Sequence, residues 1–546
     1  MKYSILLISF TLCFLYSVIC PAGMQLVQSQ TQFQVAIGSL GDDGVNSIVQ
    51  TRDSGYVMAG YTTSFGAGYY DMYIVKIDGS GTLQWSITIG GSGDDRANSI
   101  IRTTDGGYAI AGYTSSFGAG QYDMYVVKLN SSGTLQWSKT VGGIGDDRAT
   151  SIVQTTDGGY AVAGWTTSFG AGGFDVYVVK LDGSGTLQWS KTVGGTDSDY
   201  ATSIIQNRDG SYAIFGMSAS FGNGNYDMYV VKLNNLGTIQ WSNTFGGAAI
   251  EYATSIIQTT DGGYAAAGYT YSFGAGGFDM LIIKLDSIRG GLQWSRTVGG
   301  GGATGHDFAN SIIQTPDGGF AVAGYTQSFG EGPSDMYVVK LGSGGSLQWS
   351  KTVGGTNIDV ANSIIQTPDG GFAVAGYTNS FGAGGNDMYI VKLDGSINIC
   401  GTSSTPSSIS GSGGDLRNFT STVTSPSPTV TSPSSSTGTG GTLTTICVIG
   451  IQPISNEIPG SYELYQNYPN PFNPTTKIKI QISKLADTKV TVYDILGREV
   501  EVLINEQLKP GTYEVEWNAA NYTSGVYFYK LAAGDFVETK KMLLVK

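Results

Sequence analysis

Apolar and polar positions alternate in short runs through most of the chain, and the runs recur in groups of four. One such group reads TSIVQT, YAVAGWT, DVYVVKL and LQWSKTV, between Thr150 and Val193. Val, Ile, Tyr and Thr dominate these runs, which is typical of β-strands, and Gly-containing turns separate them. Asp157-Gly158-Gly159 fits a tight hairpin, because glycine tolerates positive φ. Each group therefore predicts a four-stranded antiparallel meander.

The group occurs seven times. The aspartate that opens its third run recurs every 52 residues, with one step of 56, at Asp71, Asp123, Asp175, Asp227, Asp279, Asp335 and Asp387. A single four-stranded sheet leaves two faces uncovered, so neighbouring units must cover them, as the blades of a propeller do.

The fourth run is complete in only six groups, where its tryptophan stands at Trp85, Trp137, Trp189, Trp241, Trp294 and Trp349. Near the N-terminus, however, TQFQVAIGS (31–39) aligns with LQWSKTVGG and puts Phe33 in the tryptophan position. Phe33 lies 38 residues before Asp71, the same separation as Trp85 from Asp123. We therefore expect the N-terminal strand to complete the last blade, which closes a ring without a free edge. The prediction is an all-β, seven-bladed propeller over residues 31–396.

The stretches GDDRATSIVQTTDGGYAVAGWTTS and KLDGSGTLQWSKTVGG resemble the bacterial β-propeller repeat often called SBBP. The resemblance covers about two thirds of the chain. It implies the propeller fold and an extracellular protein, and it carries fold more than function.

The N-terminus is typical of a secretory signal peptide, predicted over residues 1–22. Lys2 precedes an apolar run from Ile5 to Ile19, and CPAG follows. A lipoprotein anchor on Cys20 is the alternative. No later stretch approaches the roughly 20 apolar residues of a membrane span, so we expect none in the mature chain.

Residues 397–457 shift to Ser, Thr, Pro and Gly, as in STVTSPSPTVTSPSSSTGTGGT. This composition predicts an extended, mobile linker, either a bare tether or a glycosylated stalk. Cys400 and Cys447 bracket the linker. In an exported protein they form one disulfide or remain two free thiols.

Alternation returns over residues 458–546, in KIKIQIS, KVTVYDILGREV, TYEVEWN and GVYFYKL, which predicts a small Ig-like β-sandwich. The opening YQNYPNPFNPTT, together with VYDILGREV and the basic end KKMLLVK, resembles the C-terminal sorting domain of the type IX secretion system. The resemblance implies export through the periplasm to the medium or the outer-membrane surface, with the type IX machinery as partner. The matching motif is Tyr468, Pro469, Asn470, Pro471, Phe472, Asn473 and Pro474. An ordinary Ig-like binding module is the alternative.

Charge limits the possible partners. The chain has 29 basic and 42 acidic residues, a formal net charge of -13, and only 13% charged residues. A nucleic-acid surface needs clustered Lys and Arg, so we exclude one.

Two sets of residues could carry binding chemistry. An acid precedes each first strand, at Asp43, Asp95, Asp147, Asp199, Glu251, Asp307 and Asp359. If these strands are innermost, the acids form a ring that either holds a cation such as Ca²⁺ or accepts N–H bonds from its own turns. The pattern breaks near the only histidine, so the second candidate set is His306, Asp307, Phe329 and Glu331. A neutral loop insertion is the alternative.

A phenylalanine also recurs in every SFG loop, where it suits either ligand stacking or packing between blades. These residues are Phe65, Phe117, Phe169, Phe221, Phe273, Phe329 and Phe381.

No metal motif with Cys/His spacing, phosphate loop or nucleophile elbow occurs in the sequence. Near-identical units also disfavour catalysis, which needs unlike residues around one point. The leading hypothesis is a secreted or surface-attached, non-catalytic propeller that binds a glycan or a protein. An extracellular polysaccharide-degrading enzyme and a purely structural surface protein are the alternatives.

Overall fold

The computed structural model describes residues 32–274, 276–300, 305–394, 459–519 and 522–545, together with the backbones of seven short strands between Ser403 and Ser455. The chain divides into two compact units, Thr31–Gln452 and Pro453–Lys546. The expected signal peptide and Cys400 lie outside the described residues. In the described part of the chain, no helix is long and apolar enough to cross a membrane.

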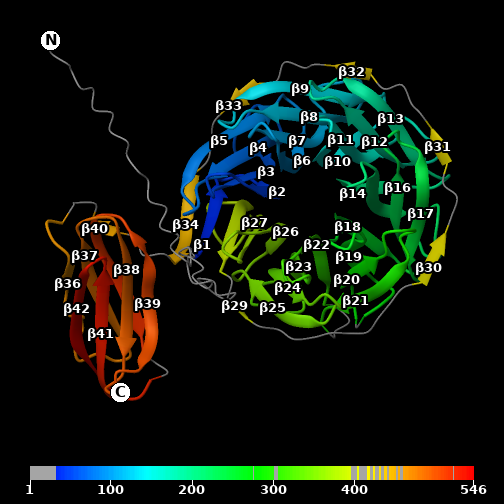
Figure 1. Cartoon of the computed structure of the whole chain (residues 1–546). Coiled ribbons are helices and arrows are strands. Elements are labelled where there is room, and N and C mark those ends of the chain that lie inside the picture. The colour runs from blue at the N-terminus through cyan, green and yellow to red at the C-terminus, as the bar shows by residue number, and fades with distance from the viewer. Residues whose placement is uncertain are drawn as a thin grey trace, which may run out of the picture. The chain divides into compact units, whose positions relative to one another are not determined.

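The first unit is a ring of seven antiparallel blades, as the repeats predicted (Figure 1). The strands of each blade follow one another from the centre of the ring outward. Blade 1 is β2 (Asp43–Gln50), β3 (Tyr56–Thr62), β4 (Asp71–Ile77) and β5 (Leu83–Gly90). Blade 2 is β6 (Asp95–Arg102), β7 (Tyr108–Thr114), β8 (Asp123–Leu129) and β9 (Leu135–Gly142). Blade 3 is β10 (Asp147–Gln154), β11 (Tyr160–Thr166), β12 (Asp175–Leu181) and β13 (Leu187–Gly194). Blade 4 is β14 (Asp199–Gln206), β15 (Tyr212–Ser218), β16 (Asp227–Leu233) and β17 (Ile239–Gly246).

The last three blades follow the same order. Blade 5 is β18 (Glu251–Gln258), β19 (Tyr264–Thr270), β20 (Asp279–Leu285) and β21 (Leu292–Val298). Blade 6 is β22 (Asp307–Gln314), β23 (Phe320–Thr326), β24 (Asp335–Leu341) and β25 (Leu347–Val353). Blade 7 is β26 (Asp359–Gln366), β27 (Phe372–Thr378), β28 (Asp387–Leu393) and β1 (Gln32–Gly38).

The N-terminal strand completes blade 7, which confirms the predicted closure. β1 pairs antiparallel with β28, with Phe33 opposite Lys392 and Ile37 opposite Met388. Phe33 packs edge-on against Tyr56 of blade 1 with ring centres 6.0 Å apart, as Trp85 packs on Tyr108 at 6.3 Å. Phe33 therefore occupies the tryptophan position of its blade.

The hydrophobic core lies between blades rather than within one. In one cluster, Val57 and Ile74 of blade 1 pack against Ile110 and Tyr125 of blade 2, and all four side chains are fully or almost fully buried. The same arrangement recurs at the other junctions. Because each blade is covered only by its neighbours, the fold depends on ring closure.

Glycine is required where the first two strands of a blade bulge. A Cβ at Gly164 of β11 would lie 1.8 Å from the Arg148 carbonyl oxygen, next to the register shift between Ala149 and Ser151. Only glycine allows this close approach.

The Ser/Thr/Pro/Gly-rich segment is partly strand, which differs from the free tether or stalk that its composition predicted. Six of its strands each pair with the outer strand of a blade (Figure 1). They are β29 (Ser403–Ser404), β30 (Asp415–Asn418), β31 (Thr422–Thr424), β32 (Thr429–Thr431), β33 (Ser436–Gly438) and β34 (Thr442–Ile449). Composition could not reveal this pairing, because a strand edge accepts backbone groups from almost any sequence.

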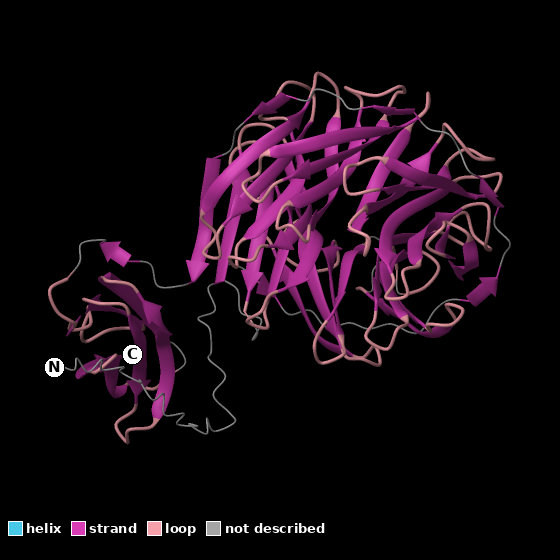
Figure 2. Cartoon of the chain, turned by 45° about the horizontal axis from the view of Figure 1, so that its top comes forward, coloured by secondary structure: helices cyan, strands magenta, loops and turns pink. Residues whose placement is uncertain are grey.

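The second unit consists of two four-stranded sheets, so the predicted β-sandwich is confirmed. One sheet has the order β35 (Pro453–Ser455), β40 (Gly511–Asn518), β37 (Thr475–Ile482) and β36 (Glu463–Leu464). The other has the order β39 (Glu499–Leu508), β38 (Ala486–Tyr493), β41 (Gly525–Ala533) and β42 (Phe536–Leu544). Ile480, Trp517 and Tyr529 are fully buried in this unit. The tilted view in Figure 2 shows that both units are built from strands and loops.

Candidate functional site: an aromatic face of the propeller

The seven acids predicted to form a ring stand at the first position of each innermost strand, and all are fully buried. Asp147 is representative. Its carboxylate accepts hydrogen bonds from the Gly143 N–H (2.7 Å) and the Ser168 hydroxyl (2.6 Å), and a third from the Thr166 hydroxyl. These bonds tie the start of the innermost strand to the loop after the second strand.

A second buried acid lies beside each of the first set. Asp123 accepts hydrogen bonds from the Ala119 and Gly120 N–H groups, at 2.9 and 3.0 Å. A Cβ on Gly142 would contact both Asp123 and Asp147, so glycine makes room for the pair. Burial raises the pKa of Asp123, and the neighbouring Asp147 adds to the rise.

The same pair closes the ring at the junction of blades 7 and 1. There, burial raises the pKa of Asp387 to about 6, with Asp43 as the repulsive neighbour. Among the described residues, no group of three or more His, Cys, Asp or Glu side chains could hold a metal ion. The bonding of the ring acids favours a role as turn acceptors over a cation site.

The repeated phenylalanines of the SFG loops pack against tyrosines of the third strands. Phe169 lies 5.6 Å from Tyr177 between ring centres and joins the core between blades 2 and 3. Phe329, one of the predicted contact residues, packs on Tyr337 in the same way at 5.7 Å. This position therefore serves packing between blades.

The remaining predicted contact residues differ in their burial and in their hydrogen bonding. Asp307 is buried and accepts hydrogen bonds from Gly300 and Ser328, like the other ring acids. Glu331 is exposed. His306 is half-buried, and its Nδ1 accepts a hydrogen bond from the Phe278 N–H at 2.9 Å.

His306 also adjoins a feature that the sequence analysis missed. Its ring centre lies 5.6 Å from Phe278 and 6.0 Å from Phe308. Both belong to a row of aromatic side chains over blades 1 to 6, at the same end of the blades as the acids. We call this row the aromatic arc: Tyr61, Tyr70, Tyr113, Tyr122, Trp165, Phe174, Tyr200, Tyr226, Tyr252, Tyr269, Phe278, Phe308 and Tyr325.

Three positions of each repeat supply the arc. They are the residue after the ring acid, the penultimate residue of the second strand, and the residue before the third strand. In blade 3 and its neighbour, Trp165 lies 4.9 Å from Phe174 and 5.9 Å from Tyr200. Further on, Phe308 stacks on Tyr325 with centres 4.4 Å apart. Successive rings from Trp165 to Tyr325 touch from blade to blade.

Two arginines carry the arc across blades 1 and 2. The guanidinium carbon of Arg96 lies 3.5 Å from the ring centre of Tyr70, and that of Arg148 lies 3.9 Å from Tyr122. Arg148 also lies 5.2 Å from Trp165, which joins the two parts of the arc. Each arginine makes an ion pair of 2.9 Å with the aspartate two residues before it. The ion pairs thus hold the guanidinium groups over the aromatic rings.

Most side chains of the arc are half-buried, so one face of each is packed and another reaches solvent. Burial raises the pKa of Tyr200 to about 12, and its phenol is therefore a neutral hydrogen-bond donor near pH 7. The arc offers apolar faces with phenol hydroxyls and a low density of charge, which suits neutral ligands with both apolar and hydroxyl surfaces.

A signal for the arc was present in the repeats. The residue after the ring acid varies from unit to unit while its neighbours stay nearly constant: Gly44, Arg96, Arg148, Tyr200, Tyr252, Phe308 and Val360. Variation at one position of an internal repeat indicates a surface that differs between blades.

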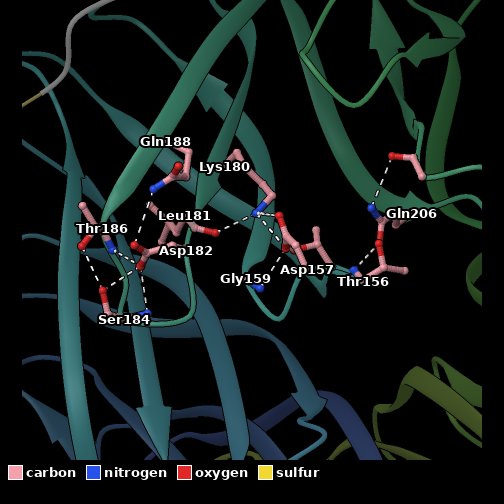
Figure 3. A network of polar contacts seen from close by, with 12 residues as sticks. Thr156, Asp157, Gly159, Lys180, Leu181, Asp182, Ser184, Thr186, Gln188 and Gln206 are labelled. Atoms are coloured by element: carbon pink, nitrogen blue, oxygen red, sulfur yellow. Dashed lines mark hydrogen bonds and ion pairs between the residues drawn. The ribbon is translucent and has the colours of Figure 1, made fainter.

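The opposite end of the blades is built from repeated polar turns (Figure 3). Lys180 makes an ion pair of 2.9 Å with Asp157 and donates to the Leu181 carbonyl at 3.0 Å. Asp182 accepts bonds from the turn residues that follow it, and the Thr156 N–H donates to the Gln206 side chain of the next blade at 2.8 Å. All six other blades repeat the ion pair, so this end serves stability.

In the second unit, the predicted sorting motif lies against the C-terminal strand. Phe472 is buried and packs on Trp517 with ring centres 5.5 Å apart. Its N–H donates to the Leu543 carbonyl, and its carbonyl accepts from the Val545 N–H, both at 3.0 Å. The motif therefore holds the basic C-terminal end in place, while Tyr468 remains 80% exposed.

Residues 466–546 match the family described as the secretion system C-terminal sorting domain. This chain carries a type IX sorting domain C-terminal to a β-propeller. Residues 103–135 match a second family, a β-propeller domain of unknown function named DUF5122. The sorting domain implies secretion and association with the cell surface or outer membrane, with the type IX machinery as partner.

Among curated proteins, the chain is 27% identical over 195 residues to the regulatory protein FlaEY of Caulobacter vibrioides; the match covers 33% of this chain and 20% of FlaEY. Among solved structures, PorZ of the type IX system of Porphyromonas gingivalis is similar at 13% identity and a TM-score of 0.39, covering 93% of this chain and 60% of PorZ. An endo-1,5-α-L-arabinanase of Thermotoga petrophila has 11% identity and a TM-score of 0.23, and the match covers 65% of this chain and 99% of the arabinanase. The chain spans a fifth of FlaEY and three fifths of PorZ.

Proposed function

We propose that the protein is a surface-displayed propeller that acts as a non-catalytic binding module for an extracellular glycan. The aromatic arc is the observation that carries the proposal. It is a row of mostly half-buried rings over six of the seven blades, on one face of a protein whose tail implies export. The rings are in unbroken contact from Trp165 to Tyr325, and arginines bridge them over blades 1 and 2.

A sugar chain fits the chemistry of the arc. The C–H faces of sugar rings pack on tyrosine and tryptophan faces, and phenol groups exchange hydrogen bonds with sugar hydroxyls. Contacts such as Trp165–Tyr200 at 5.9 Å and Tyr200–Tyr226 at 6.1 Å offer successive rings to successive sugars. The arginines are already neutralised by Asp94 and Asp146, so the arc favours a neutral or weakly charged glycan.

The state of the carboxylates supports a binding role over hydrolysis. A glycosidase needs two carboxylates that reach the sugar from opposite sides. The ring acids next to the arc are fully buried, and Asp147 already accepts three hydrogen bonds from its own loop. They are therefore turned toward the protein instead of the ligand.

The test is binding of the full mature chain to a panel of neutral and acidic polysaccharides by affinity gel electrophoresis, compared with the double variant Trp165→Ala/Tyr200→Ala. We expect retardation by at least one neutral polysaccharide and a loss of about 10-fold or more in affinity for the variant, since each stacking side chain contributes about 1 kcal/mol. Tyr69→Ala removes an aromatic side chain that is 80% exposed and outside the arc, so it should bind normally.

Equal binding by the double variant and the Tyr69 variant would reject the arc as the site. Absence of retardation by every polysaccharide, with capture of a protein partner that depends on Trp165, would replace the glycan by a protein. Release of reducing ends by the unmodified protein would overturn the non-catalytic proposal.

A further inference from the structure

The strands of the Ser/Thr/Pro/Gly-rich segment pair with the blades in one constant register. Asp415 lies opposite Gly246, Thr422 opposite Gly194, Thr429 opposite Gly142 and Ser436 opposite Gly90. Each partner glycine is the last residue of an outer strand. From each of these blades to the next, the paired glycine lies 52 residues earlier in the chain, while its partner in the segment lies seven residues later. This relation holds three times in succession.

The sequence of the segment has the same period. TVTSPSP is followed by TVTSPSS and STGTGGT, in steps of seven from Thr422. Pro426, Pro428 and Pro433 all fall between the paired stretches. Proline has no N–H to donate and is excluded from paired positions inside a sheet, so its placement agrees with strand pairing at each step.

The segment visits the blades in the reverse of their order in the chain. β29 pairs with blade 6, and β30, β31, β32 and β33 pair with blades 4, 3, 2 and 1. β34 then pairs with β1 over seven residue pairs, from Gln32–Ile449 to Gly38–Thr442. Figure 1 shows these strands along the outer rim of the ring. The circuit ends on the strand that closes the propeller.

We propose that the strands β29 to β34 form a belt that locks the closed ring. An outer strand of a blade presents a row of backbone N–H and C=O groups, and the belt pairs with them on six blades. Where the ring closes, β1 pairs with β28 on one side and with β34 on the other. Neighbouring blades that share the belt then cannot separate at the rim unless the belt unpairs from one of them, which slows unfolding. The belt also covers strand edges that could pair with other chains.

The paired strands of the belt and the sorting unit do not overlap along the chain. The belt ends at Ile449, whereas the sorting unit begins at Pro453. Loss of the sorting unit would leave every paired strand of the belt in place. The effect of losing the tail depends on the sorting domain, whereas the proposed lock does not depend on it.

The test uses the full chain and two matched double variants. Val423→Pro/Val430→Pro puts proline at the middle of β31 and β32, where strand pairing excludes it. Ser427→Pro/Ser434→Pro adds the same number of prolines between the paired stretches, where the chain already has them. Hydrogen exchange of belt amides and the rate of unfolding in denaturant are measured for all three proteins.

We expect belt amides of the unmodified protein to exchange at least 100-fold more slowly than in a free peptide of the same sequence. Val423→Pro/Val430→Pro should lose this protection in β31 and β32 and unfold at least several-fold faster, while the control variant should match the parent. Unprotected belt amides in the parent would overturn the pairing. Protected amides with equal unfolding rates in all three proteins would overturn the lock.

Discussion

Phe33 gives the sharpest test of how the ring closes. It is fully buried in β1, packs on Tyr56 at 6.0 Å and fills the position that tryptophan holds in the other blades. Truncating a buried phenylalanine costs about 3–5 kcal/mol. We therefore expect Phe33→Ala to lower the free energy of unfolding by that amount, which is a large share of the roughly 5–15 kcal/mol of a typical domain.

The whole of β1 contributes more to the stability of the fold than Phe33 alone. Phe33, Val35 and Ile37 are each fully buried, and burial of such side chains contributes about 1.5–3 kcal/mol apiece. Deletion of residues 31–39 removes all three and leaves blade 7 without its fourth strand, so the variant should aggregate or melt at a much lower temperature.

Phe33→Trp provides the matched control. The ring of Trp85 in the next blade lies 3.2 Å from the Cβ position of Gly133, and Phe33 lies 3.1 Å from that of Gly81. A tryptophan should therefore be accommodated at little cost. Equilibrium unfolding in urea, followed by circular dichroism, measures all three variants. A loss of less than 1 kcal/mol in Phe33→Ala, or a deletion variant that melts like the parent, would refute the closure by β1.

Two further predictions concern pH and export. The folded pKa of Asp387 is raised from 3.8 to about 6 by burial, so its contribution to stability is complete below about pH 4 and is lost as pH rises through 6. Asp387→Asn should remove roughly 3 kcal/mol of this pH dependence, seen as a flatter plot of unfolding free energy between pH 4 and 8; an unchanged slope would contradict it. Deletion of residues 462–546 should leave the protein in the periplasm of a host with the type IX machinery, measured by cell fractionation and surface labelling, and continued surface display would rule out the tail as the export signal.

Local sequence determined the blades. Alternation with a period of two, Gly turns and the 52-residue repeat decide strand length and pairing between neighbours in the chain, because these depend on contacts within one unit. Closure by Phe33 could also be predicted, since a count of strands shows which one is missing. The sorting domain was predicted from its motif, and its sandwich follows from the same alternation.

The remaining features depend on how the blades are arranged in the closed ring. The aromatic arc takes residues from three positions of the repeat over six blades, and Trp165 meets Tyr200 only because consecutive blades are packed side by side. The ring acids looked like one charged site in sequence, yet each accepts hydrogen bonds from its own loop, as Asp147 does from Ser168. The belt is the clearest case: its strands pair with partners up to several hundred residues away, and backbone pairing at an edge leaves only a weak trace in side-chain composition.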